Sequence, residues 1–197
     1  MMINTHSPFI FVANNLAIDF VNTCVQKNGA PFELLNSEMD FLSWAHQAGF
    51  SLSVEVPEVD LQRSYQFRQA LKTLFTAKAD HQPLPSKALE LLNSYLKNAP
   101  IQQQLVQTSH QLSLQPLNSV LSFDQLLGDI AYRASQVLVS SAKQPIRKCA
   151  SDQCILLFLD ISKAKKRRWC SMEICGNRAK AATFYQTGKA QQENTQQ

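Results

Sequence analysis

The chain has 197 residues, of which 45 % are hydrophobic, 9 % aromatic and 17 % charged. This is the composition of a folded globular protein rather than a disordered one, and no apolar run reaches the roughly 18 residues that cross a bilayer. The first 20 residues lack a basic start followed by an apolar core. We therefore expect no signal peptide, no membrane contact and a cytoplasmic location.

Charge divides the chain into two parts. Residues 1–142 carry 8 Lys and Arg against 11 Asp and Glu, whereas residues 143–189 carry 11 against 3, within a total net charge of +4. Four of the five cysteines also lie in the second part. A segregated positive charge is typical of a nucleic-acid-binding module. We predict domains at residues 1–142 and 143–187, followed by a disordered tail at 188–197.

The first part is predicted to mix helices with short strands. We expect a strand at residues 8–12 and a loop at residues 27–31. Residues 16–24, between them, are ambiguous between strand and helix. Ser37, with Asp40 three residues later, indicates the start of a helix that Gly49 ends. Pro57 is expected to open a longer helix, and another follows the break at Pro83–Pro85.

Two further patterns complete the first part. Residues 104–107 and 111–115 alternate apolar and polar side chains, which favours a β-hairpin. Ser122 and Gln125 have the spacing of a capping box, and apolar residues at helical spacing then continue as far as Leu138. This is the strongest helix prediction in the chain.

The four clustered cysteines form two pairs of identical spacing. Cys149 and Cys154 are separated by four residues, and so are Cys170 and Cys175. Four thiolates satisfy the tetrahedral shell of one structural zinc ion, with Zn–S bonds of about 2.3 Å and no position left for water. Zinc is our interpretation, with a redox-switched zinc site, two disulfides and an iron–sulfur cluster as weaker alternatives. Cys24 stands apart and is expected to be a buried apolar residue.

Around the cysteines the sequence predicts a compact finger with a basic surface. Residues 155–159 favour a strand, and residues 163–168 form a basic loop. Gly176 is expected to adopt a positive φ, and Asn177 to cap a helix that reaches Tyr185. The predicted fold class is α+β, with a helix-rich N-terminal domain containing short strands, then a four-cysteine finger made of a β-hairpin or ribbon plus a helix.

The finger resembles a known family. RRWCSMEICGNRAKA, at residues 167–181, is similar to the signature of the CGNR zinc-finger family, and the upstream cysteine pair and Phe158-x-Asp160-x-Ser162 match as well. LAIDFVNT, at residues 16–23, resembles the ABATE domain that precedes this finger in many bacterial proteins. The resemblance implies a stress-induced transcriptional regulator with a DNA-binding finger. Its zinc ligands would be Cys149, Cys154, Cys170 and Cys175.

Two functions of the finger stay open. For DNA binding, phosphates would be contacted by Lys163, Lys165, Lys166, Arg167 and Arg168, and base edges by Arg178 or Lys180. The structural alternative is a solvated loop, with Arg178 bracing the metal site. The other function is protein interaction or RNA binding through Trp169, Phe184 and Tyr185, unless these residues are packed in the core. A homodimer would suit operator binding.

The N-terminal part offers a candidate ligand site and no catalytic motif. Buried polar groups need partners, and for Asp19, Asn22, Thr23 and Arg68 these would be either a small-molecule effector or protein groups such as Arg63 and backbone amides. No Ser-His-Asp order, phosphate-binding loop or H-E-x-x-H motif occurs, and the four histidines are scattered. We therefore expect a non-enzymatic protein.

Overall fold

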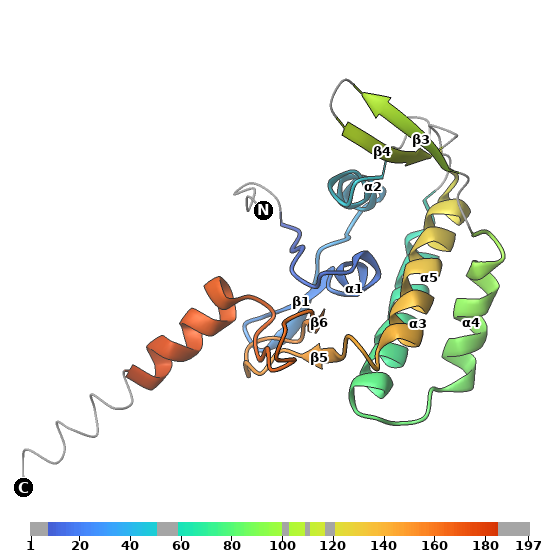
Figure 1. The fold of residues 1–197 in the computed structure, drawn as a ribbon. Helices are drawn as coiled ribbons and strands as arrows, with labels where there is room; N and C mark the ends of the chain where they lie inside the picture. The colour runs from blue at the N-terminus through green and yellow to red at the C-terminus, as the bar shows by residue number, and fades with distance from the viewer. Residues whose placement is uncertain (1–7, 51–58, 100–102, 109–110, 117–120, 185–197) are drawn as a thin grey trace, which may run out of the picture.

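A computed structural model of the chain describes residues 8–50, 59–99, 103–108, 111–116 and 121–184. Three long helices lie together, and Figure 1 shows them beside the short helices and the finger: α3 (Leu61–Ala79), α4 (Ser86–Leu96) and α5 (Phe123–Ser140). The short helices are α1 (Leu16–Val21), which packs against α3 and α5, and α2 (Glu38–Gln47). Within the described ranges the strands form three separate antiparallel pairs. The mixed helix-and-strand class is confirmed.

Local capping signals place several helices as predicted. The Asp40 N–H donates to Ser37 Oγ over 3.1 Å at the start of α2. At the start of α5, the Gln125 N–H donates to Ser122 Oγ over 3.1 Å and the Ser122 N–H donates to Gln125 Oε1 over 2.9 Å. Both bonds of the capping box are therefore formed. Helix α4 follows Pro85, which confirms the predicted break.

Helix α3 and residues 8–12 differ from the predictions. Helix α3 begins at Leu61 because Asp60 is its N-cap and accepts the Arg63 N–H over 3.0 Å. The predicted start, Pro57, lies outside the described residues. Residues 8–12 form no strand, because the N–H of Val12 points to the Asp19 carboxylate rather than to a neighbouring strand.

The ambiguous segment and the predicted loop are also resolved. Residues 16–21 are helical, and strand β1 (Cys24–Lys27) follows. The expected loop is instead a hairpin, in which β1 pairs with β2 (Ala30–Glu33). Its two turn residues, Asn28 and Gly29, have φ values of 53° and 81°, as a type I′ turn requires. The prediction of a loop was wrong because it gave no weight to the Asn-Gly pair.

The other two strand pairs come from two separate parts of the sequence. The predicted hairpin is confirmed as β3 (Gln103–Thr108) paired with β4 (Gln111–Pro116). In the finger, β5 (Ile146–Lys148) pairs with β6 (Leu157–Leu159). The strand predicted at residues 155–159 is therefore shorter than expected, and β5 had no sequence prediction.

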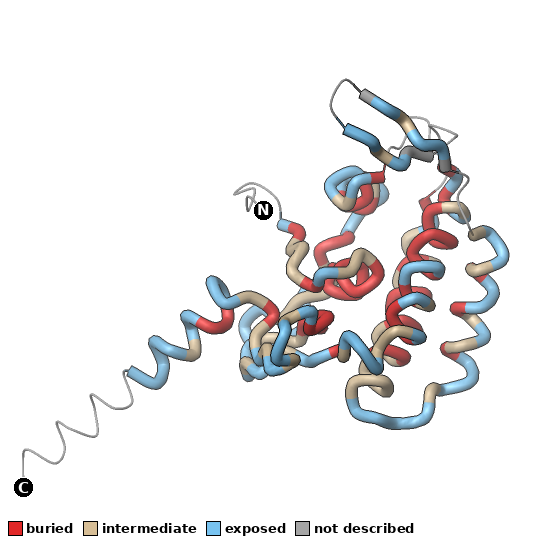
Figure 2. The backbone as a smooth tube through the Cα atoms, viewed as in Figure 1, coloured by how far each residue is buried: buried red, intermediate tan, exposed pale blue. Residues whose placement is uncertain are grey.

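The buried side chains form one continuous core. Its centre is aromatic: the ring centroid of Phe20 lies 5.2 Å from that of Trp44 and 6.3 Å from that of Phe67. The same cluster extends into the finger through Ile146 and Phe158, and Figure 2 shows buried segments of the chain along α1, α3, α5 and the finger. Within the described ranges, no helix combines the length and apolarity that crossing a bilayer requires.

Candidate metal centre and nucleic-acid interface

The four clustered cysteines converge on one point. Their Sγ atoms all lie within 4.8 Å of one another, with 3.7 Å between Cys154 and Cys170 and 3.6 Å between Cys170 and Cys175. A tetrahedron of sulfur atoms around zinc, with Zn–S bonds of about 2.3 Å, has edges of about 3.8 Å. The sulfur positions therefore fit one zinc ion held by four thiolates.

Tight backbone turns position each pair of cysteines. The Cys149 N–H donates to Leu156 O over 3.0 Å, and the Cys154 N–H donates to Ser151 O over 3.0 Å. These two bonds bend the chain between β5 and β6 so that both thiols face inward. A bond of 2.9 Å from the Ala150 N–H to Arg168 O ties this turn to the loop that carries the second pair.

The second pair lies on one wide turn of helix. Ser171 caps a π-helical turn at Met172–Gly176, and its hydroxyl accepts the Ile174 N–H over 3.3 Å. The chain continues as an α-helix through residues 177–184. Asn177 therefore lies inside the helical region, with φ of −67° and ψ of −37°, and is not the cap that the sequence predicted. The predicted end at Tyr185 lies outside the described residues.

Gly176 lies in a confined space and does not have a positive φ. It is absent from the positive-φ residues, which contradicts the prediction of a left-handed turn. A Cβ atom placed on Gly176 would overlap Met172 Sδ and lie 3.2 Å from Trp169 Cδ1. The side chains of Met172 and Trp169 therefore close over the position of the glycine.

The thiols are in hydrogen-bond contact with one another. Hydrogen bonds from the Cys154 and Cys170 thiols, with a further one from the Cys170 N–H over 3.5 Å, hold the pKa of the Cys149 thiol far below its usual range. The same bond with Cys149 raises the pKa of Cys154. A bound zinc ion would replace the shared protons and cross-link the two loops.

Five of the seven predicted DNA-contacting residues are exposed on the finger, and two are turned inward. The exposed ones are Lys163, Lys166, Arg168, Arg178 and Lys180. The Lys165 ammonium donates to Asp160 O over 3.1 Å. The Arg167 guanidinium donates to Val12 O over 3.1 Å, to Trp169 O over 2.9 Å and to Cys170 O. The N–H groups of the Arg167 guanidinium thus bind backbone carbonyls in and near the metal loop and do not point to solvent.

An open pocket of about 380 Å³ lies beside the segment that leads to Cys170. It is lined by Lys166, Arg167, Arg168, Trp169 and Met172. The Arg168 guanidinium lies 5.0 Å from the centroid of the Trp169 ring. The pocket therefore combines exposed cations with an aromatic and a thioether side chain.

Asp160 shapes the basic loop and was missed as a site residue by the sequence predictions. Its buried carboxylate accepts the Ser162 hydroxyl over 2.5 Å and the N–H groups of Ser162 and Arg167, each over 3.0 Å. Burial alone would raise the pKa of Asp160, but these hydrogen bonds outweigh it and lower the pKa. The signal for this role was the Asp-x-Ser spacing, which is typical of a side chain that caps its own turn.

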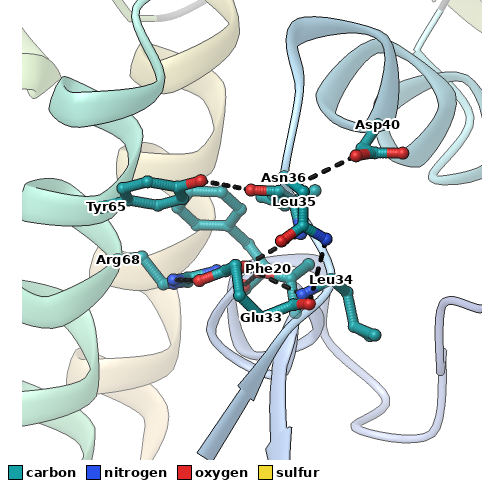
Figure 3. A network of polar contacts seen from close by, with 9 residues as sticks. Phe20, Glu33, Leu34, Leu35, Asn36, Asp40, Tyr65 and Arg68 are labelled. Atoms are coloured by element: carbon teal, nitrogen blue, oxygen red, sulfur yellow. Dashed lines mark hydrogen bonds and ion pairs between the residues drawn. The ribbon is translucent and has the colours of Figure 1, made fainter.

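Every residue of the candidate ligand site has a partner within the protein. Arg68 forms a two-pronged ion pair with Glu33, which Figure 3 shows between α3 and β2, and it also donates to Thr23 Oγ1 over 2.8 Å. Asp19 Oδ1 accepts the N–H groups of Val12 and Ala13 over 3.1 and 3.0 Å. In the described part of the chain no buried side-chain N or O atom lacks a hydrogen bond. Protein groups were the predicted alternative to a small-molecule effector. Backbone amides are indeed the partners of Asp19, whereas Arg63 pairs with Asp124 instead.

Family models match both parts of the chain. One model, described as "Putative stress-induced transcription regulator" and named ABATE, matches residues 14–141, and the CGNR zinc finger model matches residues 146–187. The chain belongs to the ABATE family. A comparison with curated proteins gives no match. The predicted family resemblance is confirmed for both segments, and the four cysteines of the CGNR finger are placed to hold one zinc ion.

Residues next to α1, among them Asn22 of the ABATE motif, bind the CGNR finger. Asn22 Nδ2 donates to Leu157 O over 2.9 Å, and the Leu157 N–H donates back to Asn22 Oδ1 over 3.0 Å. The Leu159 N–H donates to Ala13 O over 2.9 Å, and Asn14 Nδ2 donates to Leu159 O over 3.2 Å. Strand β6 is therefore bound by residues that flank α1 on both sides.

We expect Asp19 to make the stability of the ABATE region depend on pH. Burial raises the pKa of Asp19 to about 7, against the opposing hydrogen bonds from Ala13 and Val12, whereas the unfolded value is 3.8. Asp19 therefore binds its proton more tightly in the folded state than in the unfolded state. The stabilisation of the folded state by this proton is lost as the pH rises toward and through 7. Asp19→Asn keeps the Oδ1 acceptor without the charge. From pH 5 to 7 the wild type should lose about 2 kcal/mol of unfolding free energy relative to this variant.

Urea titrations of both proteins at pH 5, 6, 7 and 8 measure this difference. Because every other titrating group is common to the two proteins, subtraction isolates Asp19. A constant difference across this range would show that Asp19 keeps the same protonation state in the folded and unfolded chain.

Proposed function

We propose that this ABATE-family protein is a zinc-dependent, DNA-binding transcriptional regulator whose CGNR finger contacts DNA. The observation that carries the proposal is the set of five exposed cations on the finger, in a chain whose first 142 residues have a net charge of −3. Positive charge gathered on one small module attracts DNA phosphates and directs the module to the duplex. The regulator family that the ABATE region matches supports the same conclusion.

The basic loop is held in a fixed shape before any contact with DNA. The Asp160 carboxylate binds the backbone of Ser162 and Arg167, and the Arg167 side chain fixes the loop that leads to Cys170. Lys163, Lys166 and Arg168 project from this frame. Less conformational entropy is then lost on binding, because the backbone that carries these cations is already ordered.

Arg178 and Lys180 are proposed to face base edges, since they are exposed on the helix at residues 177–184. We propose a structural rather than catalytic role for zinc, because four thiolates fill its coordination shell and leave no position for a reactive water. Effector binding at Asp19, Asn22, Thr23 and Arg68 stays a prediction. The contacts of these side chains are accounted for within the protein.

Salt dependence of DNA affinity tests the proposal. Fluorescence anisotropy with a labelled duplex, at several salt concentrations, gives the slope of log affinity against log salt. This slope is negative, and each lost phosphate contact makes it shallower by about 0.9. We expect Lys163→Gln/Lys166→Gln to make the slope shallower by about 2 and to weaken binding to all sequences alike. The matched control is Lys87→Gln/Lys97→Gln, which removes two exposed lysines on and just after α4, away from the finger in Figure 1.

Equal effects of the two double variants, or no binding even at low salt, would contradict DNA binding through the finger. An unlabelled single-stranded RNA that competes better than duplex DNA would favour the alternative function. In that case, Trp169 in the pocket and Phe184, which is 76 % exposed, are the described aromatic side chains proposed to contact bases, and Tyr185 lies outside the described residues.

A further inference from the structure

The pocket beside the segment that leads to Cys170 is lined by side chains of two chemical kinds. Lys166, Arg167 and Arg168 are cations, whereas Trp169 and Met172 contribute an aromatic ring and a thioether. The pocket volume of about 380 Å³ lies within the roughly 300–1,000 Å³ of small-molecule sites. No carboxylate is among these lining residues. The pocket therefore suits a ligand that has both an anionic group and an apolar, planar group.

Two of the three cations are available to an anionic ligand. The Arg167 guanidinium is occupied by backbone carbonyls of the protein. Lys166 and Arg168 are exposed, and within the described ranges neither forms an ion pair with a carboxylate. A phosphate group accepts charge-assisted hydrogen bonds from both kinds of side chain, and the planar guanidinium of Arg168 matches two phosphate oxygens at once.

The aromatic side of the pocket is held in place by the fold. The half-buried Trp169 ring packs against the core, and its Cδ1 would lie 3.2 Å from a Cβ atom on Gly176. The Arg168 guanidinium lies 5.0 Å from the centroid of this ring, and Arg168 O accepts the Ala150 N–H over 2.9 Å. Met172 is 49 % exposed. A planar base stacks on such aromatic and guanidinium planes, and little order has to be created when it binds.

We propose that this pocket binds a nucleoside phosphate, with the base against Trp169 and Met172 and the phosphate held by Lys166 and Arg168. A base that is paired and stacked in a duplex cannot reach the pocket without leaving the stack. The nucleoside phosphate is therefore either a free nucleotide or a nucleotide of a single strand. It would occupy two of the cations proposed above for DNA, but its binding does not depend on that function.

Nuclear magnetic resonance of the full-length, zinc-loaded protein tests the proposal with defined probes. The chain has two tryptophans, and Trp44 is only 1 % exposed, so its indole signal is an internal reference. Adenosine 5′-monophosphate should shift the Trp169 indole signal and leave that of Trp44 unchanged. Adenosine and ribose 5-phosphate should each bind at least about 10-fold more weakly, because one lacks the charged hydrogen bonds and the other lacks stacking.

Variants separate the two halves of the pocket. Arg168→Gln should weaken binding of adenosine 5′-monophosphate at least about 10-fold and leave the weak binding of adenosine unchanged, since only the phosphate meets Arg168. Lys143→Gln is the matched control, because it removes an exposed cation from the same basic part of the chain outside the pocket. It should leave both affinities unchanged. Trp169→Leu assigns the indole signal and should weaken binding of both probes, with zinc content measured to verify the fold.

A short single-stranded oligoadenylate identifies the source of the nucleotide. If it shifts the same Trp169 signal at lower concentration than adenosine 5′-monophosphate, the pocket takes a nucleotide of a strand; if not, it takes a free nucleotide. An unchanged Trp169 signal with every probe would overturn the proposal. So would equal binding of ribose 5-phosphate and adenosine 5′-monophosphate, which would show attraction by charge alone. No duplex enters the measurement, so failure here and failure of duplex DNA binding are distinguishable.

Discussion

Cys170→Ser is expected to remove stoichiometric zinc and to unfold the finger. The buried Cys170 thiol lies 3.7 Å from Cys154 Sγ and 3.6 Å from Cys175 Sγ, so it is central to the cluster. Serine offers a poor ligand at the same place, and the remaining three thiolates cannot close the shell. Structural zinc contributes about 10–16 kcal/mol of apparent binding free energy, which is folding free energy for a small module.

Metal analysis of protein purified under reducing conditions measures the first effect, as a fall from about one zinc per chain to a small fraction. Cys24→Ser is the control, because Cys24 lies on β1 outside the cluster and should leave the zinc content unchanged. A Cys170→Ser protein with full zinc content would show that the metal is held elsewhere. The second effect is read from the melting temperature, which should fall on chelation in the wild type and already be low in the variant.

The loss should extend beyond the finger into the ABATE region. Arg167 joins Cys170 O to Val12 O, and the side chain of Asn22 exchanges two hydrogen bonds with the backbone of Leu157 on β6. Without a folded finger, Asn22 and the backbone of Val12 and Ala13 lose these partners in an environment that is largely buried. Each buried polar group left without a partner costs about 1–3 kcal/mol. The two segments are therefore expected to unfold together rather than in turn.

Short-range patterns in the sequence were sufficient for helices α2, α4 and α5 and for the metal ligands. Ser122 and Gln125 lie three residues apart, so their capping box depends on nothing else in the fold. The two C-x4-C pairs similarly place their thiols through local turns, and the family motif specified which cysteines belong together. The Asn28–Gly29 turn was equally local and could have been predicted from the same rules.

Long-range partners could not be predicted from such patterns. The sequence indicated that Arg68 and Asn22 need polar partners, but it could not select Glu33, 35 residues from Arg68, or Leu157, 135 residues from Asn22. For the same reason Arg167 was predicted as a phosphate contact, since nothing in a run of six mostly basic residues distinguishes the one that turns inward. The inward position of Arg167 is stabilised by Val12 O, 155 residues away, and by the Phe158 ring, whose centroid lies 4.4 Å from the guanidinium.

The other large effect on stability is expected on α3, where two arginines each pair with a carboxylate. One of the two ion pairs is buried and the other is exposed. Arg68 is buried and meets Glu33 with both prongs of its guanidinium, whereas Arg63 meets Asp124 over 2.5 Å with side chains that are 41 % and 51 % exposed. Breaking a buried pair by removing one partner costs about 3–5 kcal/mol, and an exposed pair contributes about 0–1 kcal/mol.

We expect Arg68→Met to lower the free energy of unfolding by about 3 kcal/mol, the lower end of that range, because Glu33 Oε1 keeps the N–H groups of Leu34 and Leu35. Arg63→Met, on the same helix and with the same change of side chain, should cost no more than about 1 kcal/mol. Urea titrations at a fixed free zinc concentration measure both. Similar losses for the two variants would mean that burial of the Arg68–Glu33 pair contributes nothing beyond a surface contact. A far greater loss for Arg68→Met would instead place this pair, which joins α3 to β2 next to Thr23, among the contacts on which folding of the ABATE region depends.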